Sequence, residues 1–442
     1  MLSLIGKSAG RIRLPIRRLP LLPAVCAAVA GGLVIAVLAV WTLSGLIQTS
    51  TKAADPIDIT KLGLAIAGGV GGAVALVVAY RRQRDIEQGR FVERFGAAAA
   101  QLGASQVAVR IAGVYAMAGV ADESTGLHRQ QCIDVLCGYL RLPYSPELGE
   151  NHQTKSILKR TSADTNEPEV EEHFEYLQND KQVRSAIVRV IADHLRSDEH
   201  NWSANDFDFW KAHLVDADFS NSKFAGNVRF GYSTFVGYAN FTAAIFTSPA
   251  ALIHARFLGN ASFEDASFGD VVAFDDSNFD GYTTFERARF RGRTTFFEVK
   301  FSSHAIFDNS SFSEDVSFEG AKFSEVIRFV KSRFSRRAIF GEALFSASVF
   351  HKSANFSHAA FLGATFFNKV TFSGQTNFQC AEFAAPTTFE NVDFGSETIA
   401  FDEPQRWGPP PPQFDWDQDL SLKPENVTPV RWPPAQAPDP TT

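Results

Sequence analysis

Few side chains in this chain of 442 residues stand at a spacing that could support chemistry. His194 and His200 lie six residues apart, so on one helix they would face different directions and could not share a metal ion. Cys132 and Cys137 have apolar neighbours, which favours buried thiols that fill space over metal ligands. These pairs therefore predict no metal centre.

Two pairs of neighbouring carboxylates are the other candidates. Asp275 with Asp276, and Glu314 with Asp315, could serve as acid and base. No cluster of His or Lys accompanies either pair, so we interpret them as solvated surface. Phosphate-binding, nucleophile-elbow and zinc-protease motifs are also absent from the sequence. We expect no catalytic residue, no metal, no cofactor and no small-molecule substrate, and hence not an enzyme.

A different pattern dominates the sequence. Between Phe219 and Phe394, phenylalanine returns at alternating intervals of five and six residues, with a small or β-branched residue two places before it. Such a stripe would visit every side of a helix, so it indicates a chain that coils and turns one ring inward on each face. The rings that we predict for the core include Phe219, Phe230, Phe263, Phe274, Phe285, Phe296, Phe307, Phe318, Phe329 and Phe340.

The first copies of the repeat, residues 212–216 (AHLVD) and 217–221 (ADFSN), fit the consensus A-(D/N)-(L/F)-x-x. The chain thus resembles pentapeptide-repeat proteins over residues 207–400. The resemblance implies a right-handed quadrilateral parallel β-helix with stacked rings inside. In this chain every second face takes six residues instead of five, and the interval from Phe345 to Phe350 breaks the alternation. We interpret that break as one extra short face, which would move the six-residue corners onto the other pair of sides.

Two uncharged stretches predict a transmembrane helix hairpin. Residues 21–47 are long and apolar enough to span a bilayer, and residues 62–80 form a second such stretch. Basic residues within segment 1–20 and after Tyr80 place both termini in the cytoplasm. The expected location is the inner (plasma) membrane, with the lipid bilayer as one partner.

The remaining segments complete a mixed fold. Residues 81–142 show helical spacing and are similar to a helical module that precedes pentapeptide repeats in bacterial membrane proteins. We expect a polar linker at 143–168 and a capping helix at 169–206, in which helical spacing begins at Val170. Residues 401–442 are rich in proline and predict an extended, disordered tail.

Function can be narrowed only to a class. We expect a membrane-tethered, non-enzymatic scaffold whose rigid rod binds an unidentified protein partner. The alternative is a DNA mimic that protects topoisomerases, as the resemblance implies for some relatives. Residues 214–400 carry 20 acidic and 16 basic residues, a net charge of only −4, which disfavours mimicry. A nucleic-acid partner is not expected either. The predicted contact edge is the densest basic run, Arg287, Arg289, Arg291 and Arg293.

Overall fold

The computed structural model describes residues 34, 37–38, 41, 56–145, 155–160, 170–175, 179–341 and 348–438. The chain divides into two compact units, Met1–Glu93 and Arg94–Thr442. Helix α2 (Pro56–Leu102) runs through the boundary and includes the predicted second span, residues 62–80. The first predicted span, residues 21–47, lies almost wholly outside the described residues. Within the described part of the chain, no helix combines the length and apolar character that a bilayer crossing requires.

Three helices of the second unit form a small core. They are α3 (Val107–Asp122), α4 (Leu127–Leu140) and α5 (Asp180–Arg196). Their apolar residues recur at helical intervals and are fully buried, among them Val114, Leu136 and Ile187. A Cβ added to Gly113 would come within 2.6 Å of the backbone nitrogen of Leu102, so the end of α2 and α3 approach closely only because residue 113 is glycine.

The structure corrects two predictions between residues 143 and 206. Instead of a polar linker alone, an antiparallel hairpin forms from β1 (Lys155–Arg160) and β2 (Val170–Glu175). The capping helix begins at Asp180, not at Val170. The apolar spacing that we assigned to one helix therefore covers a strand and a helix. Valine, glutamate and phenylalanine at alternate positions are compatible with either structure, so their spacing alone could not separate the two.

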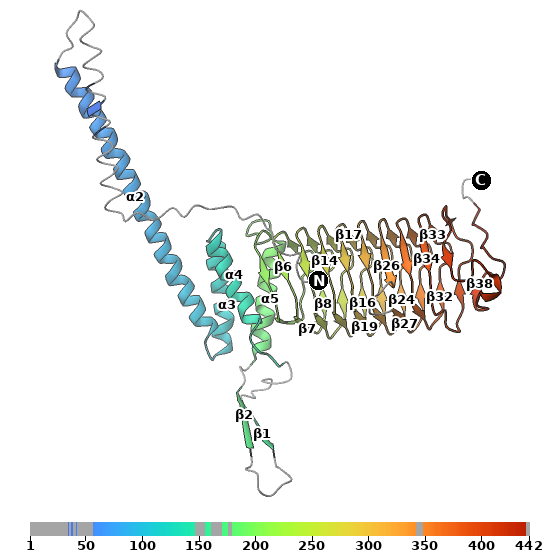
Figure 1. Cartoon of the computed structure of the whole chain (residues 1–442). Coiled ribbons are helices and arrows are strands. Elements are labelled where there is room, and N and C mark those ends of the chain that lie inside the picture. The colour runs from blue at the N-terminus through green and yellow to red at the C-terminus, as the bar shows by residue number, and fades with distance from the viewer. Residues whose placement is uncertain are drawn as a thin grey trace, which may run out of the picture. The chain divides into compact units, whose positions relative to one another are not determined.

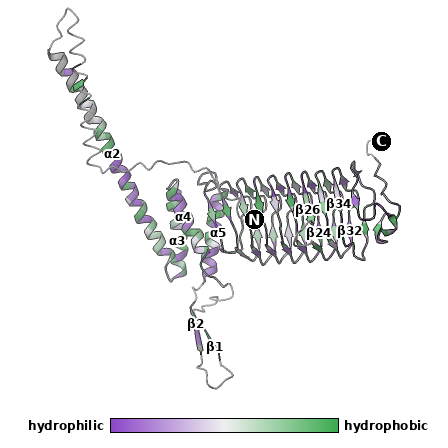
Figure 2. Cartoon of the chain, viewed as in Figure 1, coloured by the Kyte–Doolittle hydropathy of each residue, from purple (hydrophilic) through white to green (hydrophobic). Residues whose placement is uncertain are grey.

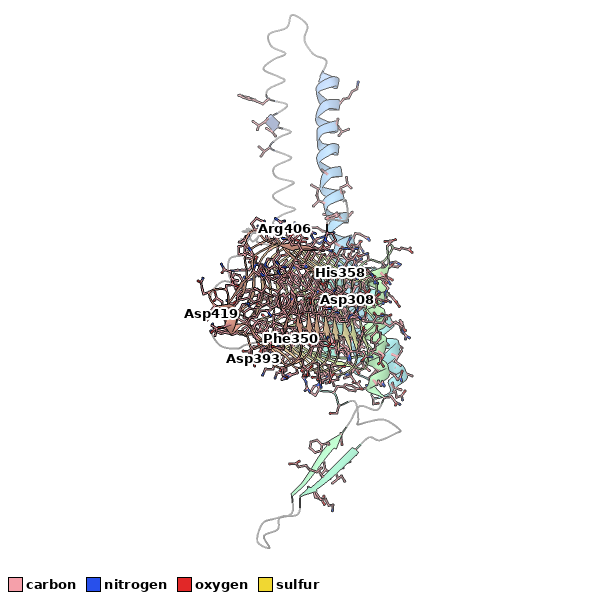
Figure 3. The ribbon with its side chains drawn as sticks, turned by 90° about the vertical axis from the view of Figure 1, so that its right-hand side faces the viewer. Asp308, Phe350, His358, Asp393, Arg406 and Asp419 are labelled. Carbon is pink, nitrogen blue, oxygen red and sulfur yellow. The ribbon has the colours of Figure 1, made fainter. Side chains whose placement is uncertain are left out.

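The solenoid follows, and its strands stack coil on coil (Figure 1). It begins at β3 (Phe207–Asp208) and forms four parallel sheets of ten, eight, nine and nine strands. Most strands are only two residues long, because each face of a coil is short. Phe296 shows the packing: its ring stacks on Phe274 and on Phe318, with centroid distances of 4.8 Å to each. The interior is therefore four columns of stacked rings. Figure 3 views the solenoid along its length.

Each strand pairs with the strand one coil later. In one of the four sheets, Phe279 pairs with Phe301, and Phe301 pairs in turn with Phe323. The five-residue corners use a left-handed backbone at the second residue after the ring, as at Arg287 (φ 57°) and Lys331 (φ 57°). The six-residue corners have one more residue, and most of them avoid this conformation. The two kinds of corner therefore differ in backbone conformation as well as in length.

The prediction that an extra face at Phe345 moves the six-residue corners to the other pair of sides is wrong. Phe345 itself lies outside the described residues, but the strands on either side of it are described. After β26 (Ala338–Gly341), the chain reaches β27 (Val349–Phe350), in which Phe350 pairs with Phe323 of the preceding coil. The corner between these two strands is five residues longer than its counterpart in the preceding coil, and we call it the enlarged corner. Every later strand keeps the sheet of its predecessors, so the six-residue corners stay on the same sides.

The Pro-rich segment is also folded, contrary to the prediction. Strands β36 (Arg406–Trp407), β37 (Gln413–Phe414) and β38 (Val427–Thr428) extend three of the sheets, and a short 3-10 helix covers Leu420–Leu422. Phe414 stacks on Phe389 at 4.6 Å. Trp416 and Trp432 lie against Phe414 and cover the last ring of the column. Aromatic side chains thus close this end of the core, which proline in the connections does not prevent.

Candidate interaction surface

Of the histidine and cysteine residues that we considered as metal ligands, His194, Cys132 and Cys137 pack against other side chains of the fold. His194 stacks on Trp202 at 4.0 Å and faces Asp122 at 3.2 Å. Cys132 and Cys137 are buried in the helical core, and burial raises the pKa of the Cys132 thiol to about 11. No group of His, Cys, Asp and Glu among the described residues could hold a metal ion.

A buried polar cluster lies between α3, α4 and α5. Asp180 accepts hydrogen bonds from Arg110 at 2.7 Å, from Arg184 at 2.6 Å and from the hydroxyl group of Tyr139 at 2.5 Å. Burial, and then the hydrogen bond to Asp180, raise the pKa of Tyr139 to about 12. Two cations and one phenol saturate this single carboxylate. The cluster therefore ties three helices together.

Asp275, one of the carboxylates singled out from sequence, is held in the solenoid wall. It accepts a hydrogen bond from the backbone N–H of Phe297 at 3.1 Å, and burial raises its pKa. Its neighbour Asp276 is exposed and lies 3.8 Å from His254 of the preceding coil. The two carboxylates thus point to different partners and do not form an acid–base pair.

The four arginines of the predicted contact edge differ in their surroundings. Arg287 forms ion pairs with Glu264, Asp265 and Glu286, which raise the pKa of its guanidinium. Arg289 lies exposed on β17 (Arg289–Phe290), and Arg291 and Arg293 lie exposed on the corner that follows. Among the described residues no carboxylate pairs with these three, whereas Arg287 is surrounded by carboxylates.

Coil stacking creates an acidic row that sequence reading missed. Glu264, Glu286 and Asp308 each follow an inward ring on successive coils. Arg287 bridges the first two, and Arg328 lies 2.5 Å from Asp308. Burial raises the pKa of Asp308. The row is therefore compensated by its own arginines and offers little free negative charge.

A basic row on a different sheet has no such compensation. We call Arg256, Lys300 and Lys322 the basic ladder. Strand pairing aligns Arg256 with Asn278, Asn278 with Lys300, and Lys300 with Lys322. The three cations are exposed, and none is within ion-pair distance of a carboxylate in the described part of the chain. Successive strands lie about 4.8 Å apart, so Lys300 and Lys322 are immediate neighbours of like charge.

The fold defines a class: a parallel β-solenoid with an aromatic core and charged outer faces. Residues 307–349 match a family model described as pentapeptide repeats (9 copies). Over this segment the chain is similar to pentapeptide-repeat proteins, and the solenoid that contains it has a Phe-rich core. No curated protein and no solved structure matches it.

Proposed function

We propose that this protein is a membrane-tethered, non-enzymatic scaffold that presents its solenoid to an acidic partner protein in the cytoplasm. The observation that supports the scaffold is the basic ladder. Like charges that are neighbours on paired strands repel one another, so the ladder lowers the stability of the isolated fold. A partner with a row of carboxylates would remove that repulsion, and the flat sheet would hold the cations in a fixed spacing.

The tether rests on the sequence. The uncharged stretches at residues 21–47 and 62–80, with basic residues on their outer sides, favour a two-span anchor with both termini inside. A reporter that is active only in the cytoplasm, fused after Thr442, should work. In intact cells the solenoid should resist added protease. Digestion of the solenoid in intact cells would contradict the proposed orientation.

The partner face can be tested separately from the tether. We would place a photo-crosslinking residue at Asn278, within the ladder, and identify the captured proteins in cells. Lys300→Glu with Lys322→Glu should abolish capture, because both cations of the contact become anions. The matched control is Lys331→Glu with Lys369→Glu, which makes the same charge change at exposed corners and should leave capture intact. Equal capture by both double variants would remove the ladder from consideration.

The DNA-mimic alternative predicts a different result. Recovery of a DNA topoisomerase, with sensitivity to reversal of Glu264 and Glu286 and not of the ladder, would favour mimicry. The compensation of those carboxylates by Arg287 makes this the weaker proposal.

A further inference from the structure

The β1–β2 hairpin has a feature that the scaffold proposal does not use. All six residues of β1 pair with β2, and these two strands form a sheet of their own within the described part of the chain. Neither outer edge pairs with another strand among the residues that the structure describes. An isolated two-stranded hairpin is marginally stable in water, and open edges readily accept another strand.

The two strands carry opposite charge. The sequence of β1 is KSILKR, with three basic residues and no acidic one, whereas β2 reads VEEHFE, with three acidic residues. The register places Lys155 opposite Glu175 and Lys159 opposite Glu171, and the second pair forms an ion pair at 2.6 Å. The hairpin thus has one basic edge strand and one acidic edge strand. Figure 2 shows the hydrophilic character of β2.

Apolar side chains are exposed on the same hairpin. Leu158 and Phe174 are 48% and 45% exposed. The register puts both on one face, since Phe174 pairs with Ser156, two residues before Leu158. Side chains project from both faces of this small sheet (Figure 3). One further strand on either edge would cover part of this apolar surface.

We propose that the occupant of these edges is the hairpin of a second copy of this chain, with β1 of one copy paired to β2 of the next. Pairing of β1 with β1, or of β2 with β2, would place like charges opposite each other, which is destabilising. Pairing of β1 with β2 flanks each basic strand with two acidic strands. It also continues the strip of Leu158 and Phe174 from copy to copy.

This arrangement is heterologous, because the two contacting surfaces differ. One contact leaves a basic edge free on one copy and an acidic edge free on the other. Further copies can therefore join, and the assembly is not limited to two chains. The inference does not depend on the scaffold proposal, since neither the basic ladder nor the membrane tether takes part in the contact.

The test exchanges the charges of the two strands. The swapped variant carries Lys155→Glu, Lys159→Glu, Arg160→Glu, Glu171→Lys, Glu172→Lys and Glu175→Lys. It keeps opposite charges within its own hairpin, so the hairpin should still form. Full-length chains with two different affinity tags are co-expressed, solubilised in detergent and captured through one tag. The fraction that carries the second tag is then measured.

Wild type should capture wild type, and the swapped variant should capture itself. Mixed capture should fall by at least about tenfold, because each β1-to-β2 contact between the two kinds of chain places like charges opposite each other. Mixed capture equal to self-capture would show that association uses another surface and would overturn the proposal. Absence of wild-type self-capture, or failure of the swapped variant to capture itself, would also overturn it.

Discussion

At the scale of single residues, the inward rings carry the stability of the solenoid. Phe296 is fully buried between Phe274 and Phe318. Phe296→Ala should therefore leave a cavity and lower the free energy of unfolding by about 3–5 kcal/mol. Urea unfolding of the purified chain would measure the loss. Phe297→Ala is the matched control: residue 297 follows the ring directly and is only half-buried, so we expect a loss below about 1.5 kcal/mol. Equal losses would mean that the faces are assigned wrongly.

Buried thiols make a second prediction at this scale. Burial raises the pKa of Cys132 to about 11, against about 8.5 in an unfolded chain. Above pH 8.5 the unfolded chain loses this proton while the folded chain keeps it, so stability should fall as pH rises toward 11. The contribution of one such group is up to about 3 kcal/mol. Urea midpoints at pH 7.5 and pH 10.5 should differ less in Cys132→Val than in wild type. If the difference between the two midpoints is the same in Cys132→Val and wild type, the loss of stability at alkaline pH comes from Cys137 and Tyr139. Burial raises the pKa values of these two groups as well.

The sequence predicted residue-scale features where one interval repeats many times. The ten core rings that we named from spacing are all buried. The basic ladder was not predicted, because Arg256, Lys300 and Lys322 are distant in the chain and become neighbours only through coil pairing. A comparison of equivalent positions in consecutive coils would have found Lys300 and Lys322. The pairing of Arg287 with three carboxylates depends on side-chain direction, which spacing does not give.

At the scale of elements, the contact between α2 and α3 depends on Gly113. Gly113→Ala would place a carbon 2.6 Å from the backbone of Leu102, which cannot move without displacing α2. We expect a loss of about 1–3 kcal/mol despite the higher helix propensity of alanine. Gly119→Ala, on the same helix with no atom within 4 Å, should instead gain up to about 1 kcal/mol. Thermal unfolding of both variants would test the pair, and a gain in both would mean that α2 and α3 do not pack closely in solution.

Element boundaries were the least predictable part of the fold. Phe174 fits the apolar spacing of the helix that follows, yet it lies in β2 and is 45% exposed. The prediction of a disordered Pro-rich tail was wrong because it rested on the proline content and ignored the aromatic residues of the segment. Trp407, Phe414, Trp416 and Trp432 are atypical of a disordered tail, in which aromatic residues are few. Weighing those four residues would have predicted a folded end.

At the scale of the whole molecule, the stack of coils requires closed ends. Trp416 and Trp432 cover the last rings, so a chain that ends at Asp402 would expose Phe389 and open strand edges. We expect this truncated chain to aggregate on purification, with light scattering as the measurement. Val430→Ser is the control, because residue 430 is 90% exposed within the same segment and should leave the chain soluble. A soluble, folded truncated chain would show that the segment is not needed as a cap.

The enlarged corner between β26 and β27 has a consequence for how such a rod changes over evolutionary time. Strand pairing resumes in phase after the five additional residues, so an insertion at this corner alters one coil without altering the order of any other. Long insertions cost little loop entropy, and most of that cost is independent of length. This corner is therefore a site that tolerates insertions, and its sequence can diverge while the core residues stay the same. Within a strand, by contrast, one added residue would turn the side chains that follow it to the opposite face.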